Sequence, residues 1–150
     1  MSLSVSKVAI VGTGFVGSTI AYSLMLDNLV RNIALIDIDE SVAKGNEIDL
    51  SHCMQFTNTI DFCSGSDFAL VKDADVVVVS AGYAQKKGET RVDLLEKNVD
   101  VFSNIIHKII KYNKNCILLI VTNPLDVMTY LSFKFSGFDK NRVLGSGTVL

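Results

Sequence analysis

The sequence predicts an α/β fold in which helices cover both faces of a parallel six-stranded sheet. Three observations support this prediction: short apolar runs recur along the 150 residues, amphipathic segments lie between them, and Gly12 or Asn123-Pro124 ends two of the runs. Short continuous apolar runs are typical of strands buried on both faces of a parallel sheet. Strands that alternate with helices form βαβ units, so residues 1–150 are expected to form one doubly wound domain.

The predicted strands differ in how clearly the residues mark them. The first is a buried run that ends in glycine, and the fourth contains four consecutive valines. The third has the weakest signal of the six. In chain order the strands are expected at residues 7–11, 33–36, 59–62, 75–80, 117–121 and 142–144.

Helices are predicted between these strands. One covers residues 41–54 with Asp39 as its candidate N-cap, and another covers 125–135 with Pro124 in its first turn. The helix after the first strand is marked by residues at helical spacing, namely Phe15, Thr19, Tyr22, Ser23 and Leu26. The longest helix is marked by an apolar stripe that should lie on the sheet, at Leu94, Leu95, Val99, Phe102, Ile105, Ile106, Ile109 and Ile110.

Composition excludes several classes of protein. Hydrophobic residues make up 49% of the chain and charged residues 20%, which indicates a globular domain. The net charge of −2 and the scattered basic residues do not favour a nucleic acid as partner. The apolar start is too short for a signal peptide or membrane segment, so a cytoplasmic protein is expected. Cys53, Cys63 and Cys116 lack zinc-site spacing, so no metal is expected and all three thiols should be reduced.

A glycine motif lies where the first strand turns into the first helix. Gly12, Gly14 and Gly17 form G-x-G-x-x-G, in which the first glycine permits a tight turn, the second lets a pyrophosphate approach the backbone and the third lets helix pack against strand. The helix N-terminus would stabilise the phosphates. The motif predicts a dinucleotide-binding Rossmann fold. Proteins that bind S-adenosylmethionine also use a glycine-rich turn, but the third glycine favours a dinucleotide.

Asp37 follows the second strand, twenty residues after Gly17. An acidic side chain at this position can accept hydrogen bonds from both hydroxyls of the adenine ribose, and its charge would repel a 2′-phosphate. No arginine follows within residues 38–43, so NAD is predicted rather than NADP. The alternative is that Asp37 caps a helix or belongs to a turn.

Three motifs occur in order in the second half of the chain. They are SAGYAQKKGETR at residues 80–91, followed by Asn98, then TNPLD at 122–126 and GSGT at 145–148. Together they resemble the motifs of L-lactate dehydrogenases, within the lactate/malate dehydrogenase family, and the resemblance runs over essentially the whole chain. It implies that residues 1–150 are the N-terminal NAD-binding domain, and that the C-terminal substrate domain is absent from this chain.

The resemblance assigns expected roles to particular residues. It implies that Arg91 polarises the substrate carbonyl, that Gln85 selects the acid, and that Asn123 and Asp126 contact the substrate, pyruvate or L-lactate. In relatives an arginine often stands where this chain has Ala84, so one phosphate contact is expected to be missing. The expected NAD contacts are Gly12, Gly14, Phe15, Val16, Gly17, Asp37, Ala81, Gly82, Tyr83, Val121, Thr122, Asn123 and Ser146.

Other functions remain open at this point. A malate dehydrogenase would carry arginine in place of Gln85 to pair with a second substrate carboxylate. A non-catalytic NAD-binding module would have no need of Arg91 or Gln85. Without the family, residues 85–89 could equally be a solvated polar loop, and Asn123 a turn residue before proline.

The resemblance also implies groups that this chain lacks. Family members use an Asp-His pair for proton transfer and a second arginine for the substrate carboxylate, whereas His52 and His107 fall on helices and are expected to be surface residues. The isolated chain is therefore expected to bind NAD weakly and to turn over little substrate. The resemblance further implies a homotetramer that acts in glycolysis or pyruvate fermentation.

Overall fold

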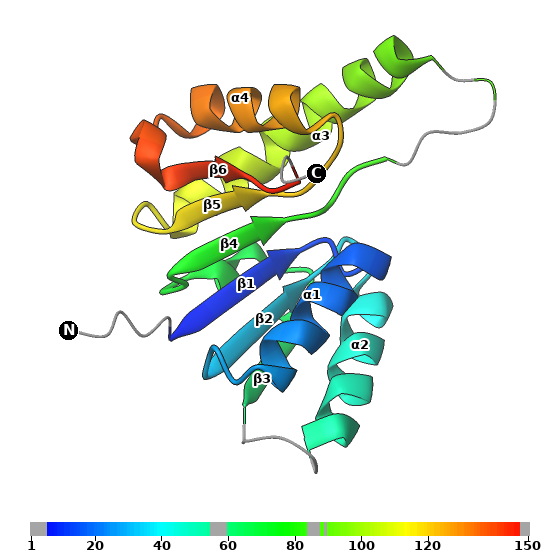
Figure 1. Cartoon of the computed structure of the whole chain (residues 1–150), viewed down its shortest axis with the longest axis vertical. Helices are drawn as coiled ribbons and strands as arrows, with labels where there is room; N and C mark the ends of the chain where they lie inside the picture. Colours follow the sequence, from blue (N-terminus) through cyan, green and yellow to red (C-terminus); the bar gives the residue numbers. More distant parts are fainter. Residues whose placement is uncertain (1–5, 55–59, 84–87, 89, 148–150) are drawn as a thin grey trace.

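The chain folds around one parallel sheet, with the strand order β3-β2-β1-β4-β5-β6. The structure is a computed structural model that describes residues 6–54, 60–83, 88 and 90–147, with the backbone alone described at 91–94 and 96. Figure 1 shows the twisted sheet and its connecting helices. The predicted doubly wound Rossmann fold, with six parallel strands, is confirmed.

The strands pair in parallel register throughout. Ala9, for example, lies between Ala34 of β2 and Val77 of β4. The strand bounds are β1 Lys7–Val11, β2 Asn32–Ile36, β3 Asp61–Gly65, β4 Val76–Val79, β5 Ile117–Ile120 and β6 Val143–Gly145.

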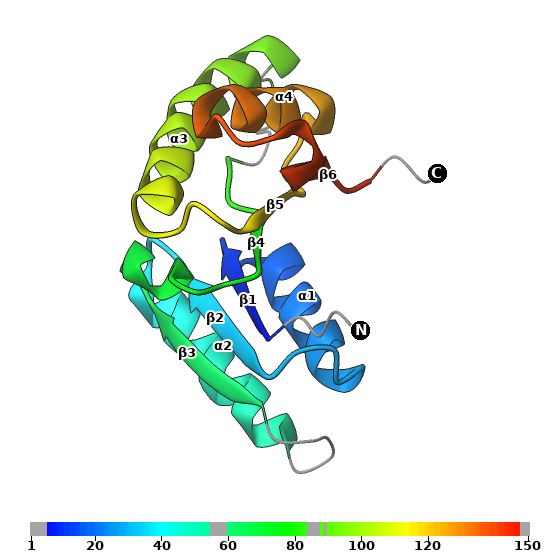
Figure 2. The same cartoon turned by 90° about the vertical axis from the view of Figure 1, so that its left-hand side faces the viewer.

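Four α-helices cover the two faces of the sheet. The helix bounds are α1 Phe15–Leu26, α2 Glu40–Cys53, α3 Arg91–Tyr112 and α4 Leu125–Ser136, with 3-10 turns η2 Phe68–Val71 and η3 Lys140–Arg142. Figure 2 shows α1 and α3 on opposite sides of the sheet. Asp39 caps α2 as predicted, because its carboxylate accepts a hydrogen bond from the backbone N of Ser41 at 3.0 Å.

The core has two layers, one on each face. On the α3 and α4 side, Phe102, Ile106 and Met128 pack on alternate residues of the central strands. On the other face, Ala21, Met25 and Leu50 of α1 and α2 pack on the remaining strand residues. The stripe predicted on α3 is confirmed for its described side chains, because each of them is buried in this core or packs against it.

The helix predicted after the first strand is confirmed as α1, whereas the predicted bounds of the third strand were wrong. In α1, Gly17, Ala21 and Met25 face the sheet, while Phe15 is 97% exposed and Leu26 is also exposed. Small residues are needed there because the helix lies close to β1. The third strand runs over Asp61–Gly65 rather than 59–62, where residue 59 lies outside the described residues.

The last third of the chain differs in small ways from the prediction. The sixth strand begins at Val143 rather than Arg142, which ends the 3-10 turn η3. Pro124 is the N-cap of α4 rather than a residue of its first turn. The turn η2 was not predicted at all. Within the described ranges, none of the helices is both long and apolar enough to cross a lipid bilayer.

Candidate dinucleotide-binding site

The predicted site lies at the carboxyl edge of the sheet, beside β1 and β4. The chain leaves β1 for a helix on one face and leaves β4 for a helix on the other face, so the two exits diverge here, which is the point at which doubly wound sheets bind their ligands. Strands β1, β2, β4 and β5 all end at this edge, and the segments that follow them begin there. They bring together Gly12–Gly17, Asp37, Ser80–Tyr83 and Thr122, which are far apart in sequence.

Packing requires two of the three motif glycines. Gly12 has φ +92°, and a Cβ there would lie 2.5 Å from the backbone N of Ala81. A Cβ at Gly17 would overlap the carbonyl oxygen of Gly12. Gly14 differs, because a Cβ there would meet nothing within 4 Å and its φ is an ordinary −68°. Packing within the protein therefore does not require glycine at position 14, and the backbone there is open to a ligand.

Asp37 lies directly against the glycine turn. Its Oδ2 accepts hydrogen bonds from the backbone N of Thr13 at 2.7 Å and from the Thr13 hydroxyl at 3.1 Å, while Oδ1 accepts from the backbone N of Asp39 at 3.1 Å. Thr13 is 1% exposed, whereas Asp37 remains half-buried and open to solvent. The helix-cap alternative for Asp37 is not supported, because Asp39 fills that role.

The segment after β4 is held by two buried polar side chains. Asn98 of α3 is fully buried, and its Oδ1 accepts a hydrogen bond from the backbone N of Tyr83 at 2.8 Å. The Thr122 hydroxyl donates to the carbonyl of Ala81 at 2.8 Å. Gly82 fits between them, because a Cβ there would lie 2.5 Å from Thr122 Cγ2. These contacts fix the backbone of 81–83 beside the glycine turn.

A dinucleotide fits these residues. The first-turn N–H groups of α1 lack intrahelical acceptors and carry the positive end of the helix dipole, which suits a pyrophosphate over Gly14. The Asp37 carboxylate suits the ribose hydroxyls. Phe15, Val16 and Ile38 are exposed apolar side chains around the turn, and Ile38 is 100% exposed. The sequence did not single out Ile38.

The remaining predicted residues are placed as follows. Asn123 follows β5 and is exposed, Val121 is half-buried, and Ser146 follows β6 with its backbone N donating to the Ile120 carbonyl at 2.9 Å. Arg91 is the first residue of α3, and its side chain lies outside the described part, as does the whole of Gln85.

Asp126 lies apart from the glycine turn. It is exposed in the first turn of α4 and lines an open cavity of about 390 Å³ between α4 and β6. Thr129, Tyr130 and Lys140 line the same cavity.

Comparison with known proteins agrees with this geometry. The sequence profile described as lactate/malate dehydrogenase, NAD binding domain, matches residues 6–145. The chain belongs to the lactate/malate dehydrogenase family. As a dehydrogenase-family NAD-binding domain, it takes NAD as its cofactor.

Several members of this dehydrogenase family are similar to the chain. The L-lactate dehydrogenase of Acetivibrio thermocellus is 52% identical over 97% of this chain and 46% of that protein. A lactate dehydrogenase structure from a Medee basin deep-sea metagenome library has a TM-score of 0.90 at 42% identity, covering 95% of this chain and 46% of that one. The malate dehydrogenase of Archaeoglobus fulgidus in complex with NADH has a TM-score of 0.90 at 42% identity, covering 94% and 48%.

The chain spans about half the length of the curated relatives it matches. The part of this chain that the family model matches, residues 6–145, includes the glycine turn and Asp37.

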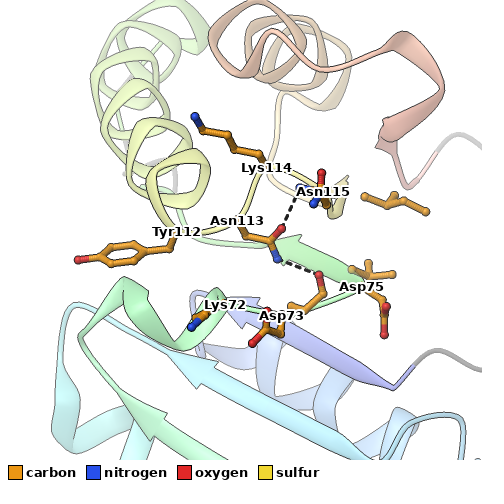
Figure 3. Close-up of a pocket in the computed structure, with 10 residues that line it drawn as sticks. Lys72, Asp73, Asp75, Tyr112, Asn113, Lys114 and Asn115 are labelled. Atoms are coloured by element: carbon orange, nitrogen blue, oxygen red, sulfur yellow. Dashed lines mark hydrogen bonds between the residues drawn. The ribbon is translucent and has the colours of Figure 1, made fainter.

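The dehydrogenase domain has a second notable opening at the amino edge of the sheet. An open cavity of about 650 Å³ lies there, lined by residues of the β4 and β5 starts and the end of α3 (Figure 3). Asn113 in its wall is 7% exposed, and both polar atoms of its side chain bind backbone groups of neighbouring segments. This cavity lies at the amino edge of the sheet, opposite the carboxyl edge that carries the glycine turn. The amino ends of strands in such sheets rarely form ligand sites.

Sequence reasoning missed two side chains at the cofactor site. Ser80 Oγ donates to the Gly12 carbonyl at 2.7 Å, and Asn46 Nδ2 donates to the Thr13 carbonyl at 2.9 Å. Ser80 is the first residue of the motif at 80–91, but neither its residue type nor its position in the motif predicted this contact. No sequence signal marked Asn46, because it lies 33 residues from its partner.

Proposed function

We propose that this chain is the cofactor-binding part of an NAD-dependent L-lactate dehydrogenase, which transfers hydride between nicotinamide and the 2-carbon of pyruvate or L-lactate. The observation that carries the proposal is the glycine turn closed onto the Asp37 carboxylate, in a chain 52% identical to an L-lactate dehydrogenase. NAD, when bound, supplies the hydride chemistry. The chain's own residues bind the cofactor and act on the substrate carbonyl.

Arg91 is proposed as the catalytic residue of this chain. It is the first residue of α3, the helix that follows β4 in the chain, and β4 ends at the carboxyl edge of the sheet. When hydride reaches the substrate carbonyl, negative charge develops on its oxygen, and a guanidinium in a water-poor site stabilises that charge. Asn123 follows β5 at the same edge and is proposed to orient the substrate.

Gln85 is proposed to determine the choice of acid. A neutral amide suits the methyl group of pyruvate, whereas a second carboxylate would require a cation at this position. The second candidate is a malate dehydrogenase, because the Archaeoglobus fulgidus malate dehydrogenase is as similar in structure as the lactate dehydrogenase from the metagenome library.

Neither histidine of the chain is proposed to transfer protons. His52 is in the last turn of α2 and His107 in the second half of α3, and both are exposed. Helices that connect parallel strands run antiparallel to them, so both histidines lie towards the amino edge, across the sheet from the glycine turn. We therefore propose that the Asp-His pair and the second arginine belong to a C-terminal part, and that this chain alone turns over little substrate.

The experiment that tests this function joins the chain to the C-terminal part of the Acetivibrio thermocellus relative. We expect the chimera to oxidise NADH with pyruvate much faster than with oxaloacetate. Gln85→Arg should shift the preference towards oxaloacetate, while Lys87→Arg, two positions later in the sequence, should not. A chimera that prefers oxaloacetate before any substitution would favour malate dehydrogenase. The C-terminal part of the relative, purified alone, controls for activity of the added part.

The remaining expectations concern the whole protein. We propose a cytoplasmic homotetramer that acts on pyruvate in fermentation, as the resemblance to lactate dehydrogenases implies. Sedimentation of the chimera would test the tetramer, and a monomer at micromolar concentration would contradict it.

A further inference from the structure

The peptide group between Thr13 and Gly14 is held in place from the protein side. Its carbonyl oxygen accepts a hydrogen bond from Asn46 Nδ2 at 2.9 Å, and Asn46 lies on α2, half-buried beneath the turn. The backbone N of Thr13 is bound to Asp37. Both backbone polar groups of Thr13, the residue between the first two glycines, are therefore hydrogen-bonded to side chains.

The Asn46 amide has one orientation that satisfies its partners. Its nitrogen donates both to the Thr13 carbonyl and to the Val42 carbonyl one turn earlier in α2, each at 2.9 Å. An amide nitrogen has two hydrogens, so both are used. The flipped amide would place its oxygen against two carbonyl oxygens, which would be repulsive. The bond to Val42 thus fixes the side chain that holds Thr13.

Peptide geometry transmits this contact to the ligand side. In a planar trans peptide the C=O and the following N–H point in opposite directions. Because Asn46 draws the Thr13 carbonyl towards α2, the N–H of Gly14 is directed away from α2. Gly14 itself is exposed, and a Cβ there would meet nothing within 4 Å, so a ligand can approach its backbone. Ser80 holds the preceding carbonyl, that of Gly12, in the same manner.

We propose that Asn46 is a positioning residue for cofactor binding: its amide holds the Thr13 carbonyl inward and thereby aims the Gly14 N–H at the pyrophosphate of NAD. Without this donor the peptide can rotate, and part of the binding free energy is then lost in ordering it. The proposal depends on NAD binding by this chain and not on which acid is the substrate.

The test compares the binding of NADH by the full chain and two variants. Asn46→Leu removes the donor, keeps a similar volume and adds no charge near the phosphates, and leucine favours helix more than asparagine does. We expect the Kd for NADH to rise about 5- to 20-fold. The matched control is Asn32→Leu, which also removes an amide bond to a backbone carbonyl, that of Ser6, but at the amino edge of the sheet. It should leave the Kd within about twofold of the parent.

A second measurement reports on Gly14 itself. In ¹H–¹⁵N spectra of the parent chain, NADH should shift the Gly14 amide signal downfield and slow its hydrogen exchange, and Asn46→Leu should reduce both effects. An unmoved Gly14 signal in the NADH-saturated parent would overturn the proposal, even if the variant failed to fold. So would parent-like NADH affinity in Asn46→Leu, an equal loss in Asn32→Leu, or no NADH binding by the parent.

Discussion

The Asp37 carboxylate holds the backbone N of Thr13 at 2.7 Å and its hydroxyl at 3.1 Å, which ties the end of β2 to the turn after β1. One oxygen, Oδ2, accepts both bonds. The other carboxylate oxygen accepts from the backbone N of Asp39, so the side chain is oriented before any ligand arrives. The negative charge therefore has a defined position beside the glycine turn.

Removing the Asp37 charge should change cofactor selectivity. In Asp37→Asn an oxygen can still accept from Thr13, but the repulsion of a 2′-phosphate is lost. We expect the NADPH-to-NADH ratio of Kd values to fall about tenfold, on the order of 1.4 kcal/mol. Fluorescence titration with each nucleotide measures this. Asp49→Asn, an exposed change on α2, is the control, and an unchanged ratio in Asp37→Asn would contradict the assigned role.

The second and third motif glycines should respond differently to alanine. Gly17→Ala would force the new Cβ against the Gly12 carbonyl, so we expect it to lower the free energy of unfolding by about 2–4 kcal/mol. Gly14→Ala has open space and an ordinary φ, so its stability should stay within about 1 kcal/mol of the parent while NADH binding weakens. Urea unfolding and NADH titration of both variants would separate the two roles. Equal stability losses would show that Gly14 serves packing.

Asn113 should contribute to stability at the amino edge. Its Nδ2 donates to the Val71 and Ala74 carbonyls, and its Oδ1 accepts from the backbone N of Asn115 and Cys116, as Figure 3 shows in part.

Asn113→Ala removes all four bonds; of the four backbone groups, the Val71 carbonyl keeps its bond from the backbone N of Ala74. We expect a loss of about 2–3 kcal/mol in the free energy of unfolding, measured by urea denaturation. Asn104→Ala, at an exposed position of α3, the helix that Asn113 follows, should change stability by less than about 0.5 kcal/mol. A similar small change in Asn113→Ala would show that solvent replaces the lost bonds.

Cys116 should make stability depend on alkaline pH. Burial raises the pKa of its thiol from 9.0 to about 11, although the nearby Arg142 guanidinium acts in the opposite direction. The thiolate is therefore disfavoured in the folded state. This stability is fully present below pH 9 and is lost as pH rises through about 11, with a total on the order of 2 kcal/mol.

Unfolding of the parent and Cys116→Ala across this alkaline range measures the effect. The stability difference between them should be constant below pH 9 and should then change in favour of the variant. A difference that stays constant up to pH 11 would contradict a buried, protonated thiol.

The parts of the fold that sequence predicts well are those with repeated local signals. The valine run of β4 reports a strand buried on both faces, and the stripe of α3 reports a single buried face on which every third to fourth residue must meet the core. The prediction was least accurate for β3, where few residues need to be buried. β3 is an edge strand with a single neighbour, and its half-exposed residues leave little apolar pattern.

The face of α1 shows another limit of periodicity. The large side chains Phe15, Tyr22 and Leu26 follow helical spacing yet are exposed, while Gly17 and Ala21 face the sheet. Close approach of helix and strand selects small residues, which hydrophobic patterns do not reveal. The roles of Arg91, Gln85, Asn123 and Asp126 stay predictions.

The residue order was sufficient for the doubly wound sheet, the glycine turn and the position of Asp37, because each depends on spacing within one or two neighbouring elements. The contacts that orient the turn could be found only in the folded chain. Asn46 and Ser80 reach their carbonyls across 33 and 68 residues of sequence. Such pairs depend on strand register and on how closely α2 packs on the sheet, and both are set by the fold as a whole.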